Sequence, residues 1–217
     1  TYLKTFLSDD RKVRLKEVLN KRTKHLTVVL ENLSNPQNAS AIVRTLDCFG
    51  VQDLHVIENT YVFKPEKVAS KGTSKWINIQ QYSEDENNTL KCLTKLKADG
   101  YQLVATSPHT EKTIFDLDYS KPTAFIFGNE HDGITEVAEE QADALVKIPM
   151  FGFAESFNIS VSVAMILQEA RNQIENKNID WGLTSEEREV LFNHWVQQSI
   201  RNPESLIKRY WEDKKKE

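Results

Sequence analysis

The sequence has few glycines and lacks the glycine-rich loops with which many α/β proteins hold a ligand. Only seven glycines occur among the 217 residues. None belongs to a GxGxxG or P-loop motif, so neither a classical dinucleotide site nor a phosphate-binding loop is expected. No GxSxG motif occurs either, which leaves an esterase of the α/β-hydrolase type without support. A ligand of this protein must therefore be held in another way.

Cysteines, metal-ligating patterns and long apolar runs are also scarce. Cys48 and Cys92 have no CxxC neighbour, which indicates reduced thiols and a cytoplasmic protein. The five histidines show no metal-ligand spacing, so no metal site is expected. No apolar run approaches the roughly 20 residues that span a bilayer, and no signal peptide is visible. We therefore expect no membrane association.

Charge is unevenly distributed along the chain, whose formal net charge is −4. Seven basic side chains lie between Arg11 and Lys24, opposed by one acid. The C-terminal stretch adds Lys208, Arg209, Lys214, Lys215 and Lys216. The segment from Glu130 to Asp143 has six acids and no Lys or Arg. This segregation suits a polyanion held by both ends of the chain, but it equally suits two solvated helix faces.

Apolar patterns predict an alternation of strands and helices. Asn35-Pro36 interrupts the chain after the first strand, and Gly50 is placed to end the following helix. Ser83 and Glu86 form a capping box before a helix that closes at Gly100. Strands are expected at 27–30, 54–57, 76–80, 103–105, 124–127 and 145–148, and helices at 11–24, 38–48, about 134–143 and 159–174. This order predicts an α/β fold with a mainly parallel sheet and helices on both faces.

The pattern changes after Asn178. Thr184 and Glu187 form a second capping box, and Pro203 can start a last helix. Three regions follow: a basic N-terminal helical extension (1–25), the α/β domain (26–178) and a C-terminal helical extension (179–217).

Three segments place polar residues where strands end, the edge at which open α/β sheets usually bind ligands. The first contains Asn38, which can cap a helix, and Arg44, which is either an exposed charge or a phosphate clamp. The second ends a buried strand in Gly128, which permits a close backbone approach, and Glu130, whose structural alternative is a first-turn helix charge.

The third of these segments follows the last strand of the α/β domain. It contains Ile148-Pro149-Met150 and then Ser156 and Asn158, either of which can cap the long helix. Each segment alone identifies no function.

Together, in this order and spacing, the segments resemble the SPOUT superfamily of RNA methyltransferases, and more narrowly its TrmH (SpoU) branch of ribose 2′-O-methyltransferases. Asn38 and Arg44 match motif 1, Gly128-Asn129-Glu130 matches motif 2, and Ile148-Pro149-Met150 with the S-x-N-x-S-x-A pattern from Ser156 matches motif 3. Arg11–Glu31 and the C-terminal helices resemble the extensions of members that modify guanosine 18 of tRNA. Relatives often carry His where this chain has Gln37.

This resemblance implies a sheet whose C-terminal part ties a deep trefoil knot, and a homodimer. It implies that S-adenosylmethionine (AdoMet) binds near Thr106, Gly128, Ile148 and Phe157. No metal is needed for this reaction.

The resemblance also implies the residues that act on the RNA. Arg44 would either accept the ribose proton or clamp a phosphate and stabilise the alkoxide. Asn38, Glu130, Ser156 and Asn158 would hold Arg44 and the ribose. Four residues of the basic N-terminal segment would bind tRNA: Arg11, Arg14, Lys21 and Arg22. A ribosomal RNA 2′-O-methyltransferase and a non-catalytic RNA-binding protein remain as alternatives.

Overall fold

The computed structural model describes residues 2–66 and 72–214. The chain forms two compact units. One is Thr23–Trp181, here called the sheet unit, and the other combines the two chain ends, residues 1–22 and 182–217, here called the terminal unit. The sequence predicted an extension at each end but not that the two would pack together. Lys215 and Lys216 of the predicted basic C-terminus lie outside the described residues.

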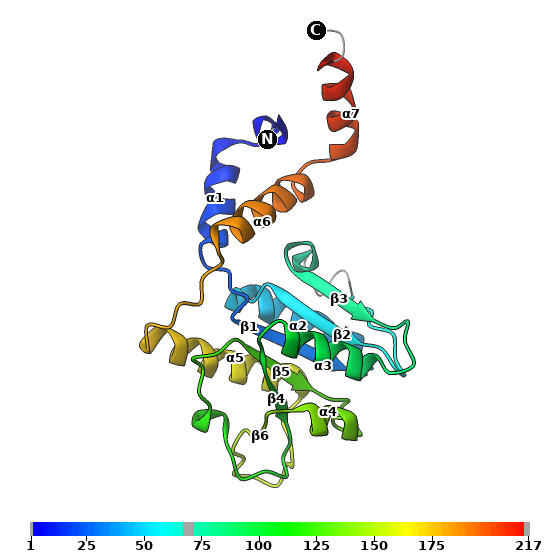
Figure 1. Cartoon of the computed structure of the whole chain (residues 1–217), viewed down its shortest axis with the longest axis vertical. Coiled ribbons are helices and arrows are strands. Elements are labelled where there is room, and N and C mark those ends of the chain that lie inside the picture. Colours follow the sequence, from blue (N-terminus) through cyan, green and yellow to red (C-terminus); the bar gives the residue numbers. More distant parts are fainter. Residues whose placement is uncertain (1, 67–71, 215–217) are drawn as a thin grey trace. The chain divides into compact units, whose positions relative to one another are not determined.

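Six parallel strands form the sheet in the order β3-β2-β1-β5-β4-β6 (Figure 1). Their bounds are β1 Leu26–Glu31, β2 Asp53–Ile57, β3 Asn78–Tyr82, β4 Gln102–Thr106, β5 Thr123–Phe127 and β6 Ala144–Val146. Every residue of the central pair β1 and β5 is buried. Such strands read as continuous apolar runs because helices cover both faces of a parallel sheet, and the predicted α/β class with a parallel sheet is confirmed.

Alternate residues of the central strands supply two separate cores. Val28 and Phe125 pack with the helices α2 (Pro36–Phe49) and α5 (Ile159–Asn176) on one face. Val29 and Ile126 pack with α3 (Asn88–Ala98) and α4 (Glu136–Gln141) on the other. Successive side chains of a strand point to opposite faces, so each face buries its own helix pair. Short 3-10 turns lie at η2 (Thr73–Trp76) and η3 (Ile114–Asp116).

Two local predictions between β2 and α3 were wrong. Ser83 and Glu86 do not cap α3, which begins at Asn88 with Asn87 as its cap, accepting from Leu90 N at 2.9 Å. The Asn88 side chain ties the preceding segment into a turn by accepting from Asp85 N at 3.0 Å. The strand predicted at 76–80 instead occupies Asn78–Tyr82, because η2 takes up the residues before it.

The terminal unit contains η1 (Tyr2–Phe6), α1 (Asp9–Leu19), α6 (Ser185–Gln198) and α7 (Pro203–Lys214). Leu15 and Leu19 of α1 are buried, as are Leu191 and Trp195 of α6, with which α1 packs. The predicted capping box at Thr184 and Glu187 is confirmed, with both reciprocal hydrogen bonds present. The helix predicted at 11–24 ends at Leu19. Among the described residues no helix combines the length and the hydropathy that a membrane crossing requires.

Candidate active site at the carboxyl edge of the sheet

The candidate site lies where four parallel strands end. β1, β5, β4 and β6 are consecutive in the sheet, so their carboxyl ends share one edge. The loops that follow them carry all three polar segments identified in the sequence. Asn35 caps α2 immediately after β1, with its Oδ1 accepting from Gln37 N and Asn38 N at 2.8 and 3.3 Å. Asn38 is therefore not the cap that the sequence suggested, and its side chain is left for another role.

Three residues from three elements form a chain of hydrogen bonds at this edge. The Asn38 Nδ2 donates to Glu130 Oε1 at 2.9 Å. The Asn38 Oδ1 accepts from Asn158 Nδ2 at 3.1 Å. Asn38 is buried on α2, whereas Glu130 follows β5 and Asn158 precedes α5. The structure thus brings together one predicted residue from each of the three sequence motifs.

Glu130 acts as an acceptor in this chain. Its second oxygen accepts from Ser34 Oγ at 3.1 Å. Burial raises the pKa of Glu130, but the hydrogen bonds donated by Asn38 and Ser34 outweigh burial, and the net pKa lies below the ordinary value. α4 begins only at Glu136, so Glu130 is not a first-turn helix charge. A carboxylate held ionised in this way orients the Asn38 amide and is poorly suited to donating a proton.

Asn158 has two roles at the start of α5. Its Oδ1 accepts from Ser160 N and Ser160 Oγ at 2.9 and 2.6 Å, which makes it the cap of the helix. Its Nδ2 remains to donate to Asn38. The capping function predicted for Asn158 and its membership of the polar chain therefore coexist, because a side-chain amide has an acceptor and a donor end.

Arg44 and Ser156 are not joined to this chain. The Arg44 side chain is exposed on α2 and has no hydrogen bond or ion pair with any residue in the described ranges. It lies six residues beyond Asn38, about 9 Å along the helix axis, and helical side chains tilt back toward the N-terminus. Ser156 is exposed in the loop before α5. Both side chains are accessible to a substrate.

The Gly128 loop is locked by backbone packing. A Cβ on Gly128 would lie 2.0 Å from the carbonyl carbon and oxygen of Gly133. Asn129 and Gly133 exchange backbone hydrogen bonds of 2.8 and 3.0 Å. The Asn129 Nδ2 donates to Asn32 O at 2.8 Å, which fastens the loop to the end of β1. Glycine is therefore required at position 128 by the turn itself, and this turn places Glu130.

The four residues predicted to hold AdoMet lie on this edge. Thr106 ends β4, Gly128 follows β5, and Ile148 and Phe157 belong to the loop between β6 and α5. Residues 148–157 make no hydrogen bond to any part of the chain that the structure describes. Their backbone N–H and C=O groups fit the polar groups of adenine and of an amino acid, and half-exposed Ile148 and Phe157 supply apolar contacts. The residues present therefore fit such a cofactor.

The predicted RNA-binding residues belong to the terminal unit. Arg11 and Arg14 lie on α1 and Lys21 follows it, all at least partly exposed. Arg22 is only 1% exposed, and its guanidinium lies 5.2 Å from the centre of the Trp195 ring. A guanidinium over an aromatic face stabilises the packing. Burial leaves almost none of the Arg22 side chain for an RNA to contact, and the basic run in the sequence gave no sign of this burial.

Sequence reasoning missed two residues that support the site. Glu31 at the end of β1 is 1% exposed and accepts from Thr89 Oγ1, Thr135 N and Thr135 Oγ1 at 2.5, 2.9 and 2.8 Å. It joins α3 and the cap of α4 to the strand that precedes motif 1. Ser34 contacts Glu130. An acidic residue at the end of an apolar strand is unusual, so the sequence carried a signal that Glu31 has a structural role. Nothing in the sequence indicated the contact of Ser34.

Comparison with known proteins agrees with the three motifs. Residues 25–168, about two thirds of the chain, match the SpoU rRNA Methylase family. The chain belongs to this family. A tRNA (guanosine(18)-2′-O)-methyltransferase of Borreliella burgdorferi is 37% identical over 203 residues, covering 92% of this chain and 90% of that protein. The enzyme of the same description from Thermus thermophilus is 38% identical over 167 residues, covering 76% and 84%.

Solved structures of SpoU family members share the fold. The Aquifex aeolicus TrmH/SpoU tRNA modifying enzyme superposes with a TM-score of 0.79 at 35% identity, over 89% of this chain and 98% of that one. The SpoU methyltransferase AviRb from Streptomyces viridochromogenes, in complex with the cofactor AdoMet, gives 0.60 at 27% identity, over 72% and 60%. The likeness to the first includes much of the terminal unit as well as the sheet unit.

Proposed function

We propose that this chain methylates the 2′-hydroxyl of guanosine 18 in tRNA, with AdoMet as methyl donor. The observation that carries the proposal is the Glu130–Asn38–Asn158 chain, which joins the three motifs at one sheet edge. Relatives with this activity in their names match 76–92% of the chain at 33–38% identity. A non-catalytic RNA-binding protein would have no need for this joined set of polar residues.

When bound, AdoMet would supply the methyl group from its sulfonium, and adenosylhomocysteine would leave as the 2′-oxygen takes that methyl. The proton of the hydroxyl would pass to water or to a phosphate of the RNA. Arg44 carries a positive charge, so we assign it to clamp an RNA phosphate and stabilise the developing alkoxide. Asn38, Glu130 and Asn158 hold the edge around the ribose, and Ser156 is exposed to contact it. Such positioning can contribute much of the rate.

The cofactor would be held by Thr106, Gly128, Ile148 and Phe157. The proposal includes the trefoil knot of residues around β6 and α5. The path of the chain supports the knot. β6 lies at the sheet edge beside β4, and α5, which follows β6 in the chain, packs on α2. A parallel bridge between Thr113 and Lys147 brings the loop after β4 against the segment after β6.

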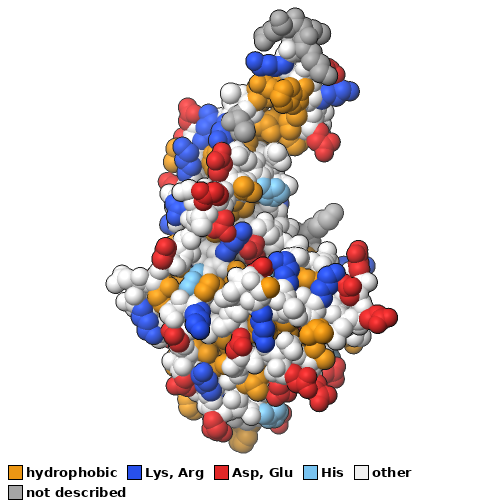
Figure 2. All heavy atoms as spheres, viewed as in Figure 1, with side chains coloured by type: hydrophobic (Ala, Val, Ile, Leu, Met, Phe, Trp, Pro, Cys, Tyr) orange, Lys and Arg blue, Asp and Glu red, His pale blue; other side chains and the backbone are white. Residues whose placement is uncertain are grey.

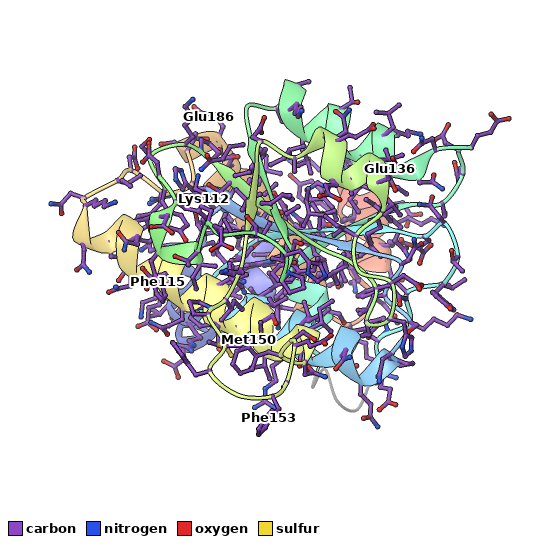
Figure 3. The ribbon with its side chains drawn as sticks, turned by 90° about the horizontal axis from the view of Figure 1, so that it is seen from below. Lys112, Phe115, Glu136, Met150, Phe153 and Glu186 are labelled. Carbon is purple, nitrogen blue, oxygen red and sulfur yellow. The ribbon has the colours of Figure 1, made fainter. Side chains whose placement is uncertain are left out.

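We also propose a homodimer in the cytoplasm. Apolar side chains are exposed on the β6–α5 loop, where Phe151 is 98% and Phe153 109% exposed. Val161 and Met165 are exposed on α5. Figure 3 shows Phe153 pointing away from the rest of the protein. Exposed apolar residues in such number mark a protein contact, and a second copy would cover them. Light scattering of the purified chain tests this, since a monomer at micromolar concentration would contradict it.

RNA would be bound chiefly by the terminal unit, through Arg11, Arg14 and Lys21. This unit has 14 Lys and Arg against 10 Asp and Glu, a formal net charge of +4, and the sheet unit has 14 against 22, a net charge of −8. A polyanion is attracted to the first and repelled by the second. The terminal unit is therefore basic, although the whole chain has a negative net charge.

Ribosomal RNA is the second candidate substrate. A 23S rRNA (guanosine-2′-O-)-methyltransferase of Neisseria meningitidis is 33% identical over 173 residues, but the match covers only 66% of that longer protein. Methyl transfer from labelled AdoMet to unmodified tRNA and to ribosomal RNA, with the modified nucleoside mapped, separates the two. Methylation of ribosomal RNA alone would overturn the tRNA assignment.

A further inference from the structure

Four aromatic side chains form a continuous surface on the terminal unit. Tyr2 and Phe6 belong to η1, and Tyr210 and Trp211 to α7. The centres of the Tyr2 and Tyr210 rings lie 4.5 Å apart, and the two ring planes are tilted by 31°. Phe6 meets Tyr2 edge-on at 5.1 Å, and Trp211 meets Tyr210 edge-on at 5.4 Å. We call these four residues the aromatic platform.

The platform is exposed although the same unit buries aromatic rings elsewhere. Trp211 is 58% exposed, Phe6 46% and Tyr2 36%, whereas Trp195 in α6 is 1% exposed. The core of this unit is formed by apolar residues of α1 and α6. Tyr210 is partly buried, but the other three rings stay exposed at the surface, and such a patch indicates a binding surface.

Charge around the platform favours a nucleic acid. Exposed Arg201, Lys208 and Arg209 lie on or next to α7, which also carries exposed Glu204 and Glu212. Lys208 pairs with Glu212 at 3.9 Å, but both side chains are more than half exposed, so the pair is weak. In Figure 2 hydrophobic side chains gather over α7 with Lys and Arg side chains on either side. Many proteins bind single-stranded nucleic acid through aromatic rings that alternate with cations. The bases stack on the rings, and the cations bind the phosphates.

We propose that the aromatic platform stacks unpaired bases of the RNA substrate, with Trp211 as the principal ring. This inference rests on the proposed function and deepens it, because it assigns the terminal unit a contact with exposed loop bases in addition to the phosphate contacts of Arg11, Arg14 and Lys21. Stacking reads the flat face of a base and tolerates any sequence. The platform therefore recognises an unpaired region and not a particular nucleotide.

The test measures the affinity of the full chain for three RNAs. These are a tRNA transcript, single-stranded oligouridylate, and an RNA duplex that has as many phosphates as the oligouridylate. Trp211→Ala should weaken oligouridylate binding about 10-fold and tRNA binding in the same direction, and should leave duplex binding within about 2-fold. Trp211→Phe should restore most of the loss because it keeps a ring. Trp211→Leu should bind like Trp211→Ala, because it keeps apolar bulk without a π face.

Val190→Ala is the matched control, since Val190 is an apolar residue 71% exposed in the same unit. Equal affinities of wild type and Trp211→Ala for oligouridylate would overturn the inference, as would wild-type affinity in Trp211→Leu. A changed oligomeric state of Trp211→Ala without loss of RNA affinity would instead make the platform a contact between copies. Failure of the wild type to methylate any tRNA would overturn the proposed function alone, because the binding comparison needs no turnover.

Discussion

The side-chain amide of Asn38 donates a hydrogen bond of 2.9 Å to Glu130 across 92 residues of sequence. The other end of the same amide accepts from Asn158 at 3.1 Å. One buried side chain in the first turn of α2 therefore links the loop after β5 to the start of α5. Only a group with a donor and an acceptor end can do this, which gives a physical reason for asparagine at this position.

Substitution of Asn38 should lower turnover without loss of the cofactor. Asn38→Ala removes both hydrogen bonds, and Asn38→Asp places a second carboxylate against Glu130. We expect about a 100-fold loss in kcat from each, with AdoMet affinity within about 3-fold of the wild type by calorimetry. Asn176→Ala, which removes an exposed Asn–Asn hydrogen bond of α5, is the control. Full activity of Asn38→Asp would show that Glu130 needs no neutral partner.

Gly128→Ala should destabilise the protein because its Cβ would meet the backbone of Gly133 at 2.0 Å. Backbone cannot move aside as a flexible side chain can, so we expect a loss of about 2–4 kcal/mol in the free energy of unfolding, measured by urea denaturation. AdoMet affinity should fall as the loop shifts. Gly152→Ala is the matched control, because a Cβ there meets nothing within 4 Å. Equal stability of the two variants would contradict the packing account.

His55 should make the protein less stable in mild acid. Its side chain is buried on β2 with Nδ1 3.1 Å from the Tyr82 hydroxyl, and burial, assisted by Lys95, lowers its pKa from 6.5 to about 4. Between these two values the unfolded chain binds a proton that the folded chain does not. The free energy of unfolding therefore falls as the pH drops from 6.5 toward 4, by about 2 kcal/mol at pH 5.

Urea denaturation at pH 7 and pH 5 measures this dependence on His55. His55→Asn keeps an acceptor for the Tyr82 hydroxyl but cannot be protonated, so its stability should vary less between the two pH values. The same pH dependence in both proteins would show that His55 does not cause it.

Charge reversal at Arg11 and Arg14 should weaken RNA binding selectively. Both side chains lie on α1 of the positively charged terminal unit, and Arg14 is 67% exposed with only a 3.3 Å contact to Glu17. Arg11→Glu with Arg14→Glu should raise the KM for tRNA about 10-fold or more at low salt, with little change in AdoMet affinity. Lys91→Glu with Lys95→Glu makes the same charge change on α3 of the sheet unit. An equal loss of affinity for tRNA and for AdoMet would contradict the assignment of tRNA binding to these residues of the terminal unit.

Much of the fold could be predicted because the buried strands are short and strongly apolar. The Thr27–Leu30 and Ala124–Phe127 runs each became a central strand, and Gly50 ended α2 in a left-handed conformation. Caps were less predictable. Ser83 with Glu86 has the pattern of a capping box, yet Asn87 accepts from Leu90 N as the cap and α3 begins only at Asn88, whose side chain accepts from Asp85 N.

The site was predictable as a set of residues but not as a set of contacts. Motif order indicated Asn38, Glu130 and Asn158, whereas their hydrogen bonds depend on which loops meet at the sheet edge. Arg22 shows the converse problem, since it shares a basic run with exposed residues but lies under the Trp195 ring, supplied by a helix from the other end of the chain. Contacts between segments distant in sequence leave no local signal.

The most direct test is methyl transfer from labelled AdoMet to an unmodified tRNA transcript by the wild type and by Arg44→Ala, with the modified nucleoside mapped by mass spectrometry. Lys177→Ala, which removes an exposed cation just beyond α5, is the control. We predict a methyl group on the ribose of guanosine 18 in the wild type and the control, and a loss of about 100- to 1,000-fold in Arg44→Ala with AdoMet binding retained. AdoMet binding by the wild type without methylation of tRNA, or full activity of Arg44→Ala, would contradict the account.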